Sequence, residues 1–191
     1  MLMAPSGTAS NEFVRTAYEN LRDLLAQGDG TFIEEGPAIL RDAIETDGFF
    51  DGVETEHAED SYTRRLVHCE PDGPVIRFME WPPEYALLPH EHHGRPCFEV
   101  LVDGQLFVAD MDAEKVAGNE YDLTVIESTV CNPGDAGIVD PRTGSDVHAV
   151  YSPVRTRSLH VYPDDNHYGI GYVPSDEPND LYRKERFQLR E

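Results

Sequence analysis

The stretch His90-Glu91-His92-His93-Gly94-Arg95-Pro96-Cys97-Phe98-Glu99 gives the strongest indication of the fold in this 191-residue chain. Two histidines one residue apart on a β-strand point to the same face, because side chains alternate with period two. His90 and His92 could therefore reach one metal ion. A third ligand must come from another strand, and we expect His148, which opens the alternating run His148-Ala149-Val150-Tyr151 after a turn-rich stretch.

An H-x-H pair followed by a distant histidine on another strand is the ligand layout of a cupin barrel. From about residue 60 the chain consists of short β-rich runs separated by Pro and Gly turns, which is typical of an all-β sandwich or barrel. The clearest expected strands are 75–79, 98–102, 105–109, 123–126 and 158–162. We therefore predict an all-β cupin (jelly-roll) barrel over about residues 60–175, with a polar tail after Pro174 that packs loosely.

A short helical region is expected before the barrel, over about residues 10–50. Ser10 could cap a first helix that ends at Gly28-Asp29-Gly30. A second helix is expected from Gly36 to Glu45, with its apolar side buried. Together with the barrel, these helices would form one cupin domain over residues 1–191.

The chain resembles the cysteine dioxygenases, a family of thiol dioxygenases within the cupin superfamily, over roughly residues 60 to 165. The positions that carry the resemblance are Tyr62-Thr63-Arg64, Trp81, His90, His92, Cys97, Gly104 and Ser158-Leu159-His160-Val161-Tyr162. A match at several separated positions is far more specific than any single motif. In the commonest cupin pattern a glutamate occupies the place of Cys97, so the cysteine points to this branch of the superfamily.

The resemblance implies that His90, His92 and His148 would bind iron(II) and leave one face of the metal open. Arg64 would hold the α-carboxylate of a bound amino acid through two parallel hydrogen bonds. The implied reaction adds both atoms of O2 to the sulfur of free L-cysteine and yields cysteine sulfinic acid. The partners would be this small thiol and dioxygen.

Further roles follow from the same resemblance. Tyr162 would hydrogen-bond the substrate, while His160 and Ser158 would orient it from behind. These three side chains share one face of a strand by alternation, so a connected hydrogen-bond network is expected. Cys97 and Tyr162 are the pair that, in enzymes of this family, can become joined by a thioether bond.

Ordinary roles remain open for some of these residues. Tyr62 and Trp81 would wall the pocket, but both are equally readable as core or rim aromatics. Glu99 shares a strand face with Cys97, and if it reached the iron the site would become a three-histidine, one-glutamate site. We expect it instead to pair with a neighbour such as Arg95 or to face a polar rim.

Composition narrows the functional classes. The formal net charge of -22 argues against nucleic acid or an anionic membrane as a partner. The 3 cysteines lack disulfide or metal-knuckle spacing, which fits a reducing compartment. The sequence begins with no recognisable secretory signal and has no run of membrane-spanning length. We therefore expect a cytoplasmic monomer.

Two alternatives stay open at this stage. Within the class, the substrate could be 3-mercaptopropionate, which lacks the amine of cysteine. From a different class, the chain could be a non-oxidising metal-binding cupin, either isomerase-like or a ligand sensor, because fold alone never excludes this. The combination of Arg64, Cys97 and Tyr162 favours thiol oxidation, since isomerases and sensors have no need of it.

Overall fold

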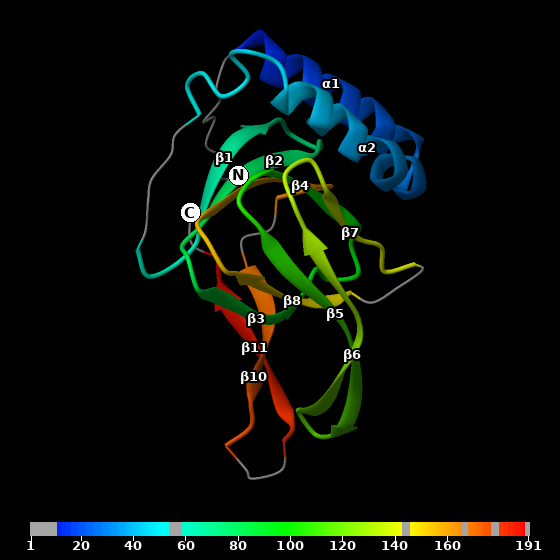
Figure 1. The fold of residues 1–191 in the computed structure, drawn as a ribbon. Helices are drawn as coiled ribbons and strands as arrows, with labels where there is room; N and C mark the ends of the chain where they lie inside the picture. The colour runs from blue at the N-terminus through cyan, green and yellow to red at the C-terminus, as the bar shows by residue number, and fades with distance from the viewer. Residues whose placement is uncertain (1–10, 54–58, 143–145, 166–167, 177–179, 190–191) are drawn as a thin grey trace.

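The computed structural model describes residues 11–53, 59–142, 146–165, 168–176 and 180–189. Two helices, α1 (Glu12–Gln27) and α2 (Asp29–Ile44), precede the β-structure. The strands of the described residues are β1 (Thr63–Cys69), β2 (Val75–Trp81), β3 (Tyr85–Glu91), β4 (Cys97–Asp103), β5 (Leu106–Ala117), β6 (Glu120–Cys131), β7 (Ala136–Val139), β8 (Val147–Ser152), β9 (Thr156–Tyr162), β10 (Tyr168–Pro174) and β11 (Tyr182–Gln188). The helices lie at one end of the molecule, and the hairpins β5–β6 and β10–β11 project from the other (Figure 1).

The strands form two antiparallel sheets. One has five strands in the order β1-β2-β9-β4-β7, and the other closes as a barrel in the order β10-β11-β6-β5-β8-β3. The predicted β-barrel with a short N-terminal helical region is confirmed. Each predicted strand lies within or overlaps a strand of the structure, although β5 and β6 are much longer than expected.

The main hydrophobic core lies between the two helices and one face of the five-stranded sheet. Leu21 of α1, Phe32 of α2, Phe98 of β4 and Val161 of β9 are at most 1% exposed. Gly36 is required where α2 crosses the sheet, because a Cβ atom there would lie 2.5 Å from Cζ of Phe98. The helices thus cover the side of the sheet that faces away from the barrel interior.

The helix boundaries differ from the predicted ones in two places. Asn11 is the N-cap of α1, and its Oδ1 accepts a hydrogen bond from the Val14 N–H at 2.8 Å, whereas the predicted cap, Ser10, lies outside the described residues. The second helix starts at Asp29 rather than Gly36 and continues through Pro37. The buried stripe that begins at Phe32 outweighs the backbone hydrogen bond that a proline inside a helix removes.

The prediction of a loosely packed tail after Pro174 was wrong. Residues Tyr182–Gln188 form β11, which pairs with β10 along its whole length and with the tip of β6. The ring of Phe187 packs so closely on Gly169 that a Cβ atom there would lie 2.4 Å from it. Packing of the Phe187 ring on the glycines of β10 orders this segment, although its composition is mostly polar.

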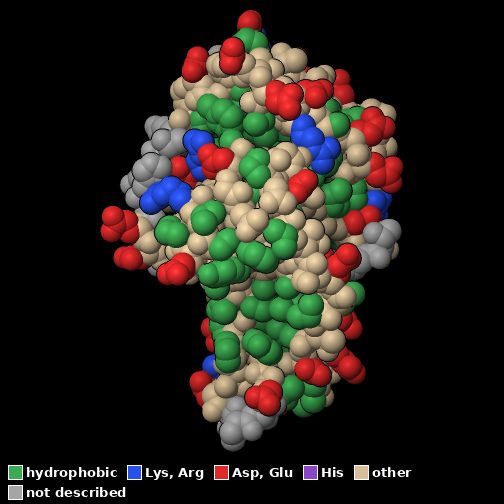
Figure 2. All heavy atoms as spheres, viewed as in Figure 1, with side chains coloured by type: hydrophobic (Ala, Val, Ile, Leu, Met, Phe, Trp, Pro, Cys, Tyr) green, Lys and Arg blue, Asp and Glu red, His purple; other side chains and the backbone are tan. Residues whose placement is uncertain are grey.

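Apolar side chains are exposed on the outer face of the barrel. Figure 2 shows them gathered in the lower half of one face, with acidic side chains along the margins. The larger exposed apolar side chains on β5, β6 and β8 are Phe107, Val116, Val125, Ile126, Val130 and Tyr151. Strand β5 therefore carries apolar side chains on both of its faces, since Leu106 and Val108 are buried inside. Among the described residues, no helix is both long and apolar enough to cross a lipid bilayer.

Candidate metal centre

Three imidazole rings converge inside the barrel. His90 on β3 is paired directly with His148 on β8, and His92 follows one residue after the end of β3. The ring centroids lie 4.6 Å (His90–His148), 4.7 Å (His92–His148) and 5.1 Å (His90–His92) apart. One nitrogen from each ring lies within 4.8 Å of the others, so this cluster could hold a metal ion.

The protonation of the rings suits metal binding. Nδ1 of His90 lies 3.0 Å from the Leu88 carbonyl oxygen, and Nδ1 of His92 lies 3.3 Å from the Asp146 carbonyl oxygen. A carbonyl only accepts, so Nδ1 carries the hydrogen and Nε2 keeps its lone pair for a metal. Burial lowers the pKa of His90 to about 3 and that of His92 to about 4, and it lowers the pKa of His148 well below the ordinary value. The rings are therefore neutral at pH 7, which is the form that binds metal.

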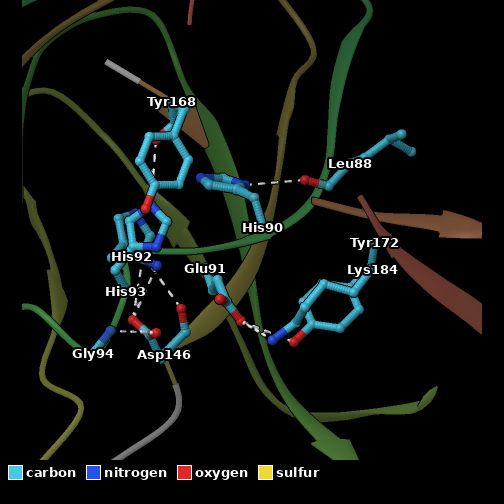
Figure 3. Close-up of polar contacts among 10 residues, drawn as sticks. All are labelled: Leu88, His90, Glu91, His92, His93, Gly94, Asp146, Tyr168, Tyr172 and Lys184. Atoms are coloured by element: carbon cyan, nitrogen blue, oxygen red, sulfur yellow. Dashed lines mark hydrogen bonds and ion pairs between the residues drawn. The ribbon is translucent and has the colours of Figure 1, made fainter. Parts of the chain in front are cut away.

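Asp146 supports this cluster and was not found from the sequence. Its Oδ1 accepts the backbone N–H of His92 at 3.0 Å, and its Oδ2 accepts the N–H of Gly94 at 2.7 Å. Figure 3 shows the carboxylate beneath the loop that carries His92. The only sequence signal was its position two residues before His148, which is weak in a chain so rich in acidic residues.

Glu91, between the two histidines, points away from the cluster. Its Oε2 lies 2.6 Å from Nζ of Lys184 and accepts a hydrogen bond from the Tyr172 hydroxyl at 3.1 Å (Figure 3). These contacts tie β3 to β10 and β11. The strand that carries His90 is thereby held against the C-terminal hairpin.

Ser158, His160 and Tyr162 of β9 face the same interior. Trp81 Nε1 donates a hydrogen bond to Ser158 Oγ at 2.9 Å, and Ser158 Oγ lies 2.8 Å from His160 Nε2. The Tyr162 hydroxyl lies 3.5 Å from His160 Nδ1. Tyr62 stacks on Trp81 with 5.2 Å between ring centroids. The expected network along β9 is present, and the two aromatics line the same cavity as the three histidines.

Arg64 of β1 also lines this cavity. Its guanidinium lies over the Tyr162 ring, with Cζ 5.5 Å from the centroid, and the residue is only 3% exposed. Within the described residues, its buried Nη1 has no hydrogen-bond partner. A buried charge of this kind lowers the free energy of the folded state only when an anion or acceptor pairs with it.

Cys97 is buried at the start of β4. The antiparallel register pairs Phe98 with Val161 and Glu99 with His160, so continuing it by one residue places Cys97 opposite Tyr162 on the same face. Burial raises the pKa of the Cys97 thiol well above its usual range. Cys97 and Tyr162 are therefore neighbours on the adjacent strands β4 and β9, and the Cys97 thiol is protonated at pH 7.

Glu99 contacts a neighbouring side chain as expected, but Arg95, the partner suggested as an example, was the wrong one. Arg95 forms an ion pair with Asp164, whereas Glu99 is 7% exposed and its Oε2 lies 3.3 Å from His160 Nδ1. Burial, followed by the charge of Asp110, raises the pKa of Glu99 to about 7. Among the described residues Glu99 is not a member of the ligand cluster, which consists of the three histidines.

The C-terminal hairpin closes one side of the cavity, and the sequence reasoning missed this. Tyr168 and Gly169 of β10, Phe187 of β11 and the adjacent Leu189 line the cavity together with the histidines. The alternation in Tyr168-Gly169-Ile170-Gly171-Tyr172 was the signal that could have identified β10.

Two antiparallel sheets with three histidines converging between them define a cupin-type barrel. No family model and no curated protein sequence matches the chain. Solved structures similar to it include a cupin superfamily protein from Desulfitobacterium hafniense, 14% identical over 58% of this chain and 84% of that chain, with a TM-score of 0.44. An RmlC-like cupin from Shewanella frigidimarina is 14% identical over 61% of this chain and 88% of that chain, with a TM-score of 0.43. A protein with a double-stranded β-helix domain from Klebsiella pneumoniae is 17% identical over 59% of this chain and 84% of that chain, with a TM-score of 0.44.

Proposed function

We propose that the protein is an iron(II)-dependent thiol dioxygenase that acts on free L-cysteine. The reaction converts R–SH and O2 into the sulfinic acid R–SO2H, so both oxygen atoms end on sulfur and no external reductant is needed. The observation that carries the proposal is the buried guanidinium of Arg64, whose Nη1 has no hydrogen-bond partner among the described residues, in the same cavity as three neutral imidazoles.

Arg64 supplies the recognition of the substrate. Its planar fork of N–H donors matches a carboxylate, and pairing with one would satisfy the free Nη1. A substrate bound in this way has a carboxylate at one end and extends toward the histidines. L-cysteine and 3-mercaptopropionate meet this requirement, whereas cysteamine, which has no carboxylate, does not.

The three imidazoles supply the metal site. Imidazole ligands suit iron, copper, nickel and zinc, and the addition of dioxygen to sulfur requires a redox-active member of this group. Iron(II) held by His90, His92 and His148 would supply that redox chemistry. Because all three ligands are neutral, the site retains the full positive charge of the ion, which favours a thiolate as the additional partner.

The wall opposite the histidines would position the substrate. Burial raises the pKa of Tyr162, so its hydroxyl stays protonated at pH 7 and can donate a hydrogen bond to a bound molecule. Trp81 and Tyr62 stack on each other and form an apolar part of the cavity lining. The chain's own residues therefore offer an anion clamp, a hydroxyl donor and an apolar wall around one small molecule.

We include in the proposal a thioether bond between Cys97 and Tyr162. Its formation removes the hydrogen from the Cys97 thiol and one hydrogen from the Tyr162 ring, and dioxygen accepts both as hydrogen peroxide. The register of β4 and β9 supports this bond, because it makes the two residues cross-strand neighbours. Intact-protein mass would be lower by two hydrogens after turnover, and Cys97→Ala would abolish the change.

Oxygen uptake tests the proposed function. Iron(II)-loaded protein is supplied with L-cysteine, 3-mercaptopropionate or cysteamine, and each product is checked by mass for two added oxygens. Uptake with L-cysteine and none with cysteamine is expected. Preference for 3-mercaptopropionate would keep the reaction class and change the substrate, and no uptake with any thiol would favour a non-oxidising metal-binding cupin.

Substitution of Arg64 sharpens the test. Arg64→Met should raise KM for L-cysteine by about 10- to 100-fold, because one or two charge-assisted hydrogen bonds are lost. Arg65→Met is the matched control, since Arg65 is the next residue on β1 and its side chain lies on the opposite face. Equal effects of the two substitutions would contradict the role of Arg64.

A further inference from the structure

A line of polar contacts along the five-stranded sheet ends at Glu99. It runs from Trp81 Nε1 to Ser158 Oγ at 2.9 Å, on to His160 Nε2 at 2.8 Å, and from His160 Nδ1 to Glu99 Oε2 at 3.3 Å. Glu99 and His160 are direct partners in the antiparallel register of β4 and β9. The site described above accounts for every member of this line except the carboxylate.

His160 is neutral in this setting, so one ring nitrogen carries a hydrogen and the other does not. Burial, followed by the charge of Arg64, lowers its pKa to about 3. Nε2 faces only Ser158 in this network, whereas Nδ1 faces two groups: the Glu99 carboxylate at 3.3 Å and the Tyr162 hydroxyl at 3.5 Å. The tautomer of His160 therefore decides what the Tyr162 hydroxyl can do.

An ionised carboxylate settles the choice of tautomer. It only accepts hydrogen bonds, so Nδ1 of His160 must carry the hydrogen when Glu99 is ionised. Nε2 then accepts from the Ser158 hydroxyl, and Ser158 Oγ in turn accepts from the indole N–H of Trp81, which only donates. In this direction each donor from Trp81 to His160 faces an acceptor, and Nδ1–H of His160 faces Glu99 Oε2 at 3.3 Å.

The same tautomer directs the Tyr162 hydroxyl. An Nδ1–H group cannot accept the Tyr162 hydrogen, so that hydrogen is left to point into the cavity with the three histidines. Without the carboxylate, Nδ1 could present its lone pair instead, and Tyr162 would donate to His160. We propose that Glu99 is a positioning residue that holds His160 in its Nδ1–H tautomer and thereby keeps the Tyr162 hydroxyl available to a ligand in the cavity.

The packing around Glu99 is built to hold the carboxylate in this place. Its other cross-strand partner is Gly137 on β7, where a Cβ atom would lie 2.7 Å from Glu99 Oε1. The absence of a side chain at 137 leaves the room that the carboxylate occupies. Glu99 lies between the cavity with the histidines and a second, polar cavity that also contains Asp110 and Thr129, so it contacts both.

The tautomer is measured directly by two-dimensional proton–nitrogen NMR of the histidine rings at pH 9, well above the pKa of about 7 to which burial raises Glu99, so that the carboxylate is ionised. The full-length protein is used both free of metal and loaded with zinc(II), which is diamagnetic. The His160 signals, identified by their loss in His160→Asn, should show a protonated Nδ1 and an unprotonated Nε2. A wild-type His160 with the hydrogen on Nε2 would overturn the proposal, whatever the variants do.

Two substitutions distinguish the effect of the Glu99 carboxylate on the His160 tautomer from that of the Tyr162 hydroxyl. Glu99→Leu should move the hydrogen of His160 to Nε2, whereas Tyr162→Phe should leave it on Nδ1, because the carboxylate remains. A hydrogen that stays on Nδ1 in a folded Glu99→Leu protein would show that Glu99 does not set the tautomer. If Glu99→Leu does not fold, the wild-type spectrum alone decides.

The consequence for turnover rests on the proposed thiol oxidation and is tested apart from the tautomer. Glu99→Leu should lower kcat for L-cysteine about tenfold or more, as loss of an oriented hydrogen-bond donor does, with little change in KM. In the Tyr162→Phe background the same substitution should have no further effect, since Glu99 acts through that hydroxyl. Additive effects would contradict the proposal, and absence of activity in the wild type would refute the proposed function while the NMR result still stands.

Discussion

The five-stranded sheet has two faces made by the same strands but with opposite chemistry. On β9, Leu159 and Val161 point to the helices, whereas Ser158, His160 and Tyr162 point into the barrel. The helix side is a continuous apolar core, and the barrel side is a polar network around the candidate metal centre. The core fixes the strands so that buried polar groups on the other face keep their hydrogen-bond geometry.

The largest effect on stability is expected when the apolar core between the helices and the five-stranded sheet is disrupted. Phe98→Ala should lower the free energy of unfolding by about 3–5 kcal/mol, as the loss of a buried aromatic ring does. Ile138→Ala is the control, because Ile138 is the cross-strand partner of Phe98 and is 49% exposed. Urea unfolding measures both, and a comparable loss in the two variants would mean that the helices do not support this face.

The candidate metal centre that borders the polar face of the five-stranded sheet is tested through metal binding, at His148 on β8 of the other sheet. His148→Ala should weaken metal binding by more than about 100-fold, because even residues that only orient a ligand contribute 10- to 100-fold. Titration calorimetry with zinc(II) measures this, with His93→Ala as the control. His93 is adjacent to His92 but lies outside the ligand cluster, with Nε2 3.3 Å from the Tyr168 carbonyl oxygen. Equal losses in the two variants would argue against the three-histidine site.

Burial of the Glu99 carboxyl on the polar face should make the stability of the protein depend on pH. The pKa of this carboxyl is raised to about 7 from the ordinary 4.5, so the folded chain holds the proton more tightly than the unfolded chain does. This contribution to stability is fully present below pH 4.5 and is lost as the pH rises through 7. The variant Glu99→Gln lacks this titrating group. The free energy of unfolding of the variant, relative to that of the wild type, should therefore increase on the order of 2–3 kcal/mol between pH 4.5 and 8. Parallel pH profiles of the two proteins in urea would contradict the assignment.

The smallest effect is expected at the contact between the barrel and its C-terminal hairpin. Lys184→Met removes the ion pair with Glu91 and the contacts with the rings of Tyr121 and Tyr172, and should lower stability by about 1 kcal/mol. The effect should shrink in high salt, because the pair is only partly buried. Lys115, the chain's other lysine, is exposed on β5, and Lys115→Met should change stability less in thermal unfolding.

Several features of the fold and the site follow from local pattern. Alternation along 158–162 predicted which β9 side chains share a face, and the spacing of His90 and His92 predicted that both reach one point. The start of α2 and the strand β11 were predicted wrongly. Pro37 obscured the helical pattern that precedes it, and the charged residues around Lys184 obscured the weaker apolar signal of a strand. In both cases packing against distant residues determines the structure, and a local pattern does not contain that information.

The sequence by itself determined the residue types that carry the chemistry and the side of each strand on which they lie, because alternation is a local property of an extended chain. Only the tertiary structure decided which distant residues meet. It brought Asp146 beneath His92, placed Glu99 beside His160 rather than Arg95, and closed the cavity with the C-terminal hairpin. These contacts depend on strand register and on the space left by residues such as Gly137. Both are fixed only when all the strands pack together.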